Sequence, residues 1–231
     1  MAQLNIRQLI SGGIITNYFC SSSCGHCLYN CSPRWEKDYI SPEAARRAGV
    51  GIFPWVTDFI SDLSQFDPNI THSLAEFSDV FGQDYMLQVL KRYWIHMGGR
   101  ALKTYRPLMG KKTFQQVLDE PTANCYGELS NTNHFHIDLF GNYIPGLCSG
   151  LSIAIEDLGK PLSDETYPIL TTLGRHGVRG LVKLAEDRVG YIPKKGLYIN
   201  KCDLCTEVRT FLVQNDYSGS NELSPAEFYR K

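Results

Sequence analysis

The sequence lacks an excess of charge of either sign. Its 23 lysine and arginine residues are balanced by 24 aspartate and glutamate residues, which gives a formal net charge of -1 at pH 7. A balanced chain offers no overall attraction for nucleic acid or for an anionic membrane surface. The sequence also lacks a run of about 18 apolar residues, the length that a membrane-spanning helix needs. We therefore expect neither a nucleic-acid nor a membrane partner.

The first residues, Met1–Arg7, lack the basic start and the apolar core of a secretory signal. We therefore expect a cytoplasmic protein, in which disulfides are rare. Cysteine, by contrast, is not scarce, since the 231 residues include eight of them. In a reducing compartment such a number favours metal binding or catalysis over a disulfide framework.

Four of the cysteines lie between Cys20 and Cys31, and Cys20, Cys24 and Cys27 have the spacing C-x₃-C-x₂-C. They follow the β-branched and aromatic segment Gly13–Phe19, which predicts a buried strand that ends at the first cysteine. Three thiolates on one short loop can face a single centre, and soft thiolate ligands select iron–sulfur clusters, zinc or Cu(I). With Cys31 as a fourth ligand, the same loop would make a closed zinc site, which is the alternative interpretation.

This spacing in a loop after a strand resembles the signature of the radical S-adenosylmethionine superfamily. The resemblance implies that Cys20, Cys24 and Cys27 hold a four-iron, four-sulfur (4Fe-4S) cluster, whose free iron binds the amine and carboxylate of S-adenosylmethionine. It implies that His26 lies near the adenine of this cofactor. It also implies a one-electron donor such as flavodoxin or ferredoxin, cleavage of the cofactor, and abstraction of hydrogen from a substrate, with a peptide as the preferred class.

The superfamily core is a partial (β/α)₆ barrel, and the chain is short for it, because six units of about 30 residues need about 180. The resemblance also implies a glycine-rich Gly-Gly-Glu-type element at the end of the second strand, which contacts the methionyl amine of the cofactor. This element is missing from the expected place. Gly98-Gly99-Arg100 lies far downstream, where we expect a loop that ends a helix. The segment Ala44–Val50 resembles the start of one helix joined to the end of another, which indicates an internal deletion. We therefore predict a truncated partial barrel of α/β class over residues 1–110, in which Gly51–Thr57 is a late strand.

The second predicted domain, residues 111–231, is a small α+β domain that carries the other four cysteines. Alternating residues and the turn signal Gly141-Asn142 predict a hairpin over His134–Leu147. Helices are predicted at Ser163–His176 and Val178–Arg188, and another helix begins at Cys202.

Cys125 and Cys148 flank this hairpin, and Cys202 and Cys205 form a Cys-x₂-Cys pair. The element Ile137–Cys148 resembles the hairpin of auxiliary-cluster domains of the SPASM and twitch type, found in radical enzymes that modify peptides. The resemblance implies a second iron–sulfur cluster on the four cysteines. A structural zinc ion and unligated thiols are the alternatives.

His134, His136 and Asp138 alternate along the first strand of the hairpin, so we expect them on one face, as a metal or proton-transfer group or as a half-exposed strand face. Three functions stay open for the whole chain. It is a radical enzyme if the truncated core is competent, a non-catalytic remnant that binds a cluster, or a structural zinc-binding module.

Overall fold

The computed structural model describes most of the second half of the chain and separate pieces of the first. The described residues are 4, 6, 12–15, 17–20, 27–35, 39–41, 43–44, 47, 87, 91, 96–120, 124–194, 196–215, 217 and 221–229. Several predicted features lie outside these residues. They are Cys24, His26, the strand predicted at Gly51–Thr57, and Arg46 and Ala48, between which a deletion was predicted.

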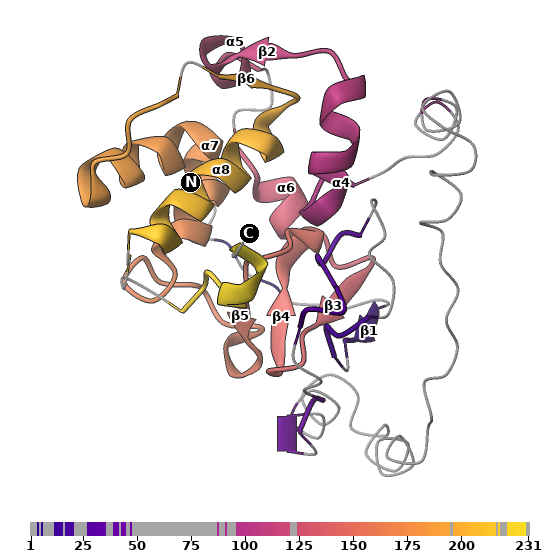
Figure 1. The fold of residues 1–231 in the computed structure, drawn as a ribbon. Helices are drawn as coiled ribbons and strands as arrows, with labels where there is room; N and C mark the ends of the chain where they lie inside the picture. Colours follow the sequence, from indigo (N-terminus) through magenta and orange to yellow (C-terminus); the bar gives the residue numbers. More distant parts are fainter. Residues whose placement is uncertain are drawn as a thin grey trace.

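A four-stranded sheet joins an N-terminal strand to three strands from the middle of the chain (Figure 1). Its strands are β1 (Gly12–Ile14), β3 (Phe135–Ile137), β4 (Asn142–Ile144) and β5 (Ile153–Ala154), in the order β1-β3-β4-β5. The pairing of β1 with β3 is parallel, and the other two pairings are antiparallel. The predicted strand before the first cysteine is therefore present but shorter, and it lies beside the predicted hairpin.

The N-terminal residues also enter the same hydrophobic core as the C-terminal ones. Leu4 and Ile6 are buried in it. The carbonyl of Leu4 accepts from the amide of Leu162 at 3.2 Å, and that of Ile6 accepts from Gly159 at 2.8 Å. The boundary between residues 110 and 111 stays a prediction, and described residues on its two sides share one sheet and one core.

The hairpin of β3 and β4 forms as predicted, with Ile137 paired to Tyr143. Its turn differs from the predicted Gly141-Asn142. Strand β3 ends at Ile137 and β4 begins at Asn142, so the turn covers residues 138–141. Asp138 is fully buried, and its Oδ1 accepts from the amides of Phe140 at 2.9 Å and Asn142 at 2.8 Å. Asp138 therefore does not lie on a half-exposed strand face with the two histidines, because it is buried at the turn after β3, where its carboxylate accepts from turn amides.

Replacing Asp138 by alanine should lower the free energy of unfolding by roughly 2 kcal/mol, because two turn amides lose their acceptor. Asp138→Asn keeps one carbonyl oxygen and should lose less. Urea unfolding followed by circular dichroism measures both, and equal stability of Asp138→Ala and the parent chain would contradict this role of the carboxylate.

Two helices form the layer beside the sheet: α7 (Pro168–Val189) and α8 (Lys201–Gln214), which pack against each other. The backbone of α7 is non-helical at Gly177, so the two helices predicted around this residue are confirmed, although the first begins at Pro168 rather than Ser163. The helix predicted from Cys202 is confirmed as α8, whose N-cap Asn200 accepts from the amides of Cys202 and Asp203.

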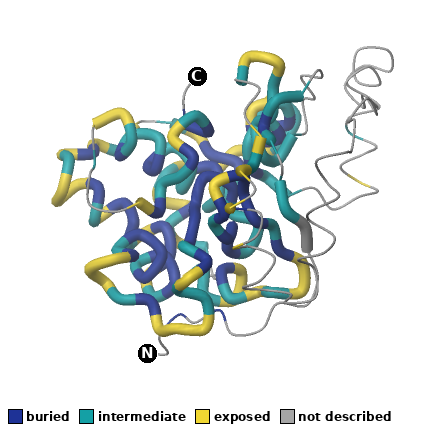
Figure 2. The backbone as a smooth tube through the Cα atoms, turned by 90° about the horizontal axis from the view of Figure 1, so that it is seen from below, coloured by how far each residue is buried: buried dark blue, intermediate teal, exposed yellow. Residues whose placement is uncertain are grey.

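The remaining helices and strands of the described part are short. They are α4 (Gly99–Tyr105), η3 (Arg106–Leu108), β2 (Lys112–Thr113), α5 (Phe114–Leu118), α6 (Tyr126–Leu129), η4 (Pro145–Leu147), η5 (Ile155–Asp157), β6 (Leu197–Tyr198) and η6 (Ala226–Tyr229). Strands β2 and β6 form a separate antiparallel pair. Figure 2 shows buried backbone through the interior and exposed backbone at the outer turns.

Helices and small sheets are thus mixed in the described residues, which form a four-stranded sheet, a two-stranded sheet and no barrel. The truncated barrel stays a prediction. No helix in the described ranges has both the length and the apolar character that crossing a membrane requires.

Candidate metal centres

The N-terminal cysteine loop is closed by contacts between its two limbs. The amide of Cys20 donates to the carbonyl of Ser32, and the amide of Ser32 donates to that of Tyr18, both at 3.2 Å. Trp35 stacks on Tyr18 with ring centroids 4.9 Å apart. This pairing brings Cys20 beside the end of the loop, where Cys27 and Cys31 lie. The charge of Cys20 also raises the pKa of Cys31, and the shared centre of Cys20 and Cys27 stays a prediction.

Cys31 contacts the sulfur of Cys27 through both its amide and its thiol. Its amide donates to the Cys27 sulfur at 3.2 Å, and its thiol donates to the same sulfur. This thiol hydrogen bond is the main cause that lowers the pKa of Cys27, and it raises the pKa of Cys31. The cation of Arg100 also lowers the pKa of Cys27. The sequence suggested Cys31 only as the fourth ligand of a zinc site, and the i, i+4 spacing to Cys27 was the available signal.

The cysteine loop rests on the start of α4. The loop expected at Gly98-Gly99-Arg100 covers only its first residue, since Gly98 is the N-cap of α4 and Gly99 its first residue. The amide of Arg100 donates to the carbonyl of Cys27 at 2.9 Å. Gly99 has a φ of +53°, and a Cβ there would lie 2.4 Å from the Cys27 carbonyl oxygen. Glycine is needed because the backbone of the cysteine loop occupies the space of a side chain.

Gly99→Ala should therefore displace the Cys27 end of the loop and reduce the metal bound at Cys20, Cys24 and Cys27. Gly110→Ala is the matched control, because nothing lies within 4 Å of a Cβ at Gly110. Metal content per chain after anaerobic purification checks both variants. Equal metal content in Gly99→Ala and Gly110→Ala would show that this contact does not shape the loop.

A histidine pair lies next to this loop. The Tyr29 hydroxyl and Nδ1 of His136 form a hydrogen bond of 2.5 Å, and the rings of His134 and His136 lie 4.8 Å apart. The prediction that the two histidines share a strand face is therefore confirmed. Burial, together with the neighbouring His134, lowers the pKa of His136 to about 4. His136 is therefore neutral at physiological pH, and the pair joins the hairpin to the cysteine loop.

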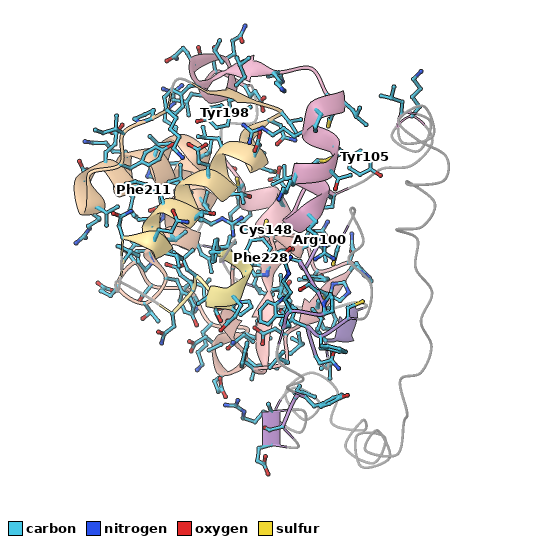
Figure 3. The ribbon with its side chains drawn as sticks, in the orientation of Figure 1. Arg100, Tyr105, Cys148, Tyr198, Phe211 and Phe228 are labelled. Atoms are coloured by element: carbon cyan, nitrogen blue, oxygen red, sulfur yellow. The ribbon has the colours of Figure 1, made fainter. Side chains whose placement is uncertain are left out.

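The four C-terminal cysteines converge from three separate segments. Cys125 is the N-cap of α6, Cys148 follows η4, and Cys202 and Cys205 lie in the first turns of α8. The η4 turn packs closely on α6, because a Cβ at Gly146 would lie 2.1 Å from the carbonyl oxygen of Glu128. Cys148 is half-buried, and Figure 3 labels it near the centre of the view.

The pKa values of these thiols reflect burial first and mutual proximity second. Burial raises the pKa of Cys125 to about 12 and that of Cys202 to about 11, and in each case the charge of Cys205 raises it further. Burial also raises the pKa of Cys148, with contributions from Cys202, Cys205 and Cys125. The four thiols are therefore close enough to influence one another's ionisation, and a metal site on them stays a prediction.

Two cationic side chains interact with the four C-terminal thiols. Lys201 pairs with Glu128 at 2.6 Å and interacts with Cys125 and Cys202. Arg209 interacts with Cys205 and Cys148. Cations near sulfur favour the thiolate, which is the form that binds a metal.

Within the described ranges, no three His, Cys, Asp or Glu side chains form a group that could hold a metal ion. The seven described cysteines are all free thiols. Each thiol can change its position by rotation about a single Cα–Cβ bond. Four soft donors from three segments, with adjacent cations, have the chemistry of a cysteine-ligated zinc or iron–sulfur site.

Comparison with known proteins adds no relative. No family model matches the chain, and no curated protein or solved structure matches it.

Proposed function

We propose that this chain is a radical S-adenosylmethionine-type iron–sulfur protein with two cysteine-ligated centres. Cys20, Cys24 and Cys27 would hold a 4Fe-4S cluster. The C-terminal thiols, Cys125, Cys148, Cys202 and Cys205, would hold a second centre. The observation that carries the proposal is the C-x₃-C-x₂-C spacing of Cys20, Cys24 and Cys27, together with the free thiols of the described cysteines.

When bound, the first cluster would supply the electron that cleaves S-adenosylmethionine, so that hydrogen can be taken from a substrate. The chain contributes a Cys27 sulfur prepared as a thiolate by Cys31 and Arg100. It also contributes the backbone contact of Arg100 that fixes the loop. His26 near the adenine, a flavodoxin or ferredoxin donor, a peptide substrate and a cytoplasmic location belong to the proposal through the resemblance of the cysteine motif.

Production of 5′-deoxyadenosine tests the enzymatic part of the proposal. The anaerobically purified chain, with S-adenosylmethionine and dithionite, should form it, and Cys27→Ala should not. If a chain that contains iron forms none, the protein is a cluster-binding remnant. That result would remove the catalytic function and leave the cluster.

A structural zinc module is the second candidate, and the contact of Cys31 with Cys27 favours it. With Cys20 and Cys24, Cys31 would complete a set of four thiolates, as closed zinc sites require. Iron, sulfide and zinc measured on the purified chain separate the two candidates. A brown protein with iron and sulfide supports the cluster, and a colourless protein with zinc supports the module.

A further inference from the structure

The described residues 221–229 form a segment that packs on the start of α7 and on the residue before β5, and we call this segment the strap. Its first anchor is Glu222, which is 1% exposed. The Glu222 carboxylate accepts from the amides of Ile169 and Leu170 at 2.6 and 2.8 Å. The Glu222 carbonyl accepts from the amide of Ser152 at 2.9 Å. The strap is therefore fixed at this end to a helix and to the sheet.

Tyr229 is the second anchor, at the other end of the strap. It is 3% exposed, and its hydroxyl donates to the carbonyl of Gly150. The same hydroxyl accepts from Nη1 of Arg209 at 2.8 Å, and this Nη1 also donates to the carbonyl of Ser149 at 2.9 Å. Two consecutive carbonyls are thus held by Tyr229 and by α8.

These two carbonyls belong to the turn that follows Cys148. The amide of Leu151 donates to the carbonyl of Cys148 at 3.0 Å, which closes the turn. Gly150 in this turn has a φ of +83°, and a Cβ there would lie 2.5 Å from Cδ1 of Phe228 and 2.6 Å from the Tyr229 hydroxyl oxygen. Glycine is needed because the aromatic rings of the strap lie directly against the turn.

The strap can separate from this turn without unfolding of the core. It contributes no strand to the two sheets of the described residues, and Asn221 and Ala226 are exposed. A segment held at a few points opens locally at a lower free energy than the core that it covers. Loss of the Tyr229 anchor therefore frees the Cys148 turn, while Glu222 keeps the strap attached to α7.

We propose that the strap is a lid that controls access to the Cys148 thiol. Docked at Tyr229, it holds the turn of this half-buried cysteine closed, and released there, it opens the sulfur to large molecules. The inference goes beyond the proposed metal centres and does not depend on them, because it concerns steric access to a free thiol. A bulky molecule that binds or modifies the Cys148 sulfur has to displace the Tyr229 anchor first.

Two thiol reagents of different size measure this access. N-ethylmaleimide is small, and a maleimide on a long polyethylene glycol chain is bulky. Both react with the thiolate, so the ratio of their rates at one cysteine reports steric access and not the fraction of thiolate. The full chain is labelled anaerobically with a chelator present, and mass spectrometry follows the loss of each unmodified cysteine peptide. Cys125, whose amide is held by the carbonyl of Leu173, is the internal reference.

Tyr229→Ala should raise the rate of the bulky reagent relative to the small one at Cys148 at least about tenfold, because the turn loses a buried hydrogen bond and a ring contact. The ratio at Cys125 should not change. Tyr229→Phe keeps the ring and should give a smaller rise. Ala226→Ser changes an exposed position of the same η6 turn and should give none.

A Cys148 ratio in Tyr229→Ala that equals the parent value would overturn the proposal. Equal rises at Cys148 and Cys125 would also overturn it, since they would indicate a general loosening of the fold. If circular dichroism shows that Tyr229→Ala does not fold, Tyr229→Phe decides the question. A rise confined to Cys148 in that variant supports the lid, and parent ratios at both cysteines contradict it.

Discussion

Replacing Cys202 and Cys205 together by serine should remove the second centre and leave the first. Both thiols lie at the start of α8, where Asn200 caps the helix independently of either sulfur, so the helix should persist. If both centres are 4Fe-4S clusters, the iron content should fall from about eight to about four per chain. Iron, zinc and sulfide measured on anaerobically purified protein give the result.

The reciprocal variant is the matched control. Cys20→Ala with Cys27→Ala should remove the N-terminal cluster and leave the metal of the C-terminal cysteines. If the serine variant keeps all its metal, the convergence of the four C-terminal thiols has no ligand role. If the alanine variant keeps all of its iron, the ligand assignment at the N-terminal loop is wrong.

Glu222→Ala should lower the free energy of unfolding by roughly 3 kcal/mol, because two buried amides lose a charged acceptor. Glu222 is 1% exposed, and its carboxylate accepts from the amides of Ile169 at 2.6 Å and Leu170 at 2.8 Å. These amides are in the first turn of α7, where a negative charge also interacts favourably with the helix dipole.

Chemical denaturation of the metal-free chain measures this loss, with Glu165→Ala as the control. Glu165 precedes the same helix and is exposed, so its removal should change stability by less than about 0.5 kcal/mol. A Glu222→Ala variant as stable as Glu165→Ala would show that water or another group satisfies the α7 amides.

The sequence predicted those elements whose signals are local. The hairpin followed from alternating residues and a glycine-containing turn, and the start of α8 followed from the apolar pattern after Cys202. The two predicted helices Ser163–His176 and Val178–Arg188 leave out Gly177, where the backbone of α7 is non-helical. In each case the residues that decide the structure lie within a few positions of one another.

Features that depend on distant partners could not be predicted in this way. Position 99 requires glycine because the Cys27 carbonyl oxygen occupies the space that a Cβ would need, and the two residues are far apart in sequence. Asp138 fits a strand alternation, but turn amides draw its carboxylate inward. Arg209 is buried because Ser149 and Tyr229, on other segments, enclose it. The spacing of the cysteines indicated two groups, and only the fold brings Cys125 and Cys148 to the Cys202-Cys205 pair.

The central claim is that the chain holds an iron–sulfur cluster at the N-terminal loop and that this cluster binds S-adenosylmethionine. The direct measurement is an electron paramagnetic resonance spectrum of the anaerobically purified, reduced protein, recorded with and without S-adenosylmethionine. We predict a 4Fe-4S signal that shifts when the cofactor is added and that is lost in Cys27→Ala. Zinc without iron, or an iron signal that does not change with the cofactor, would contradict it.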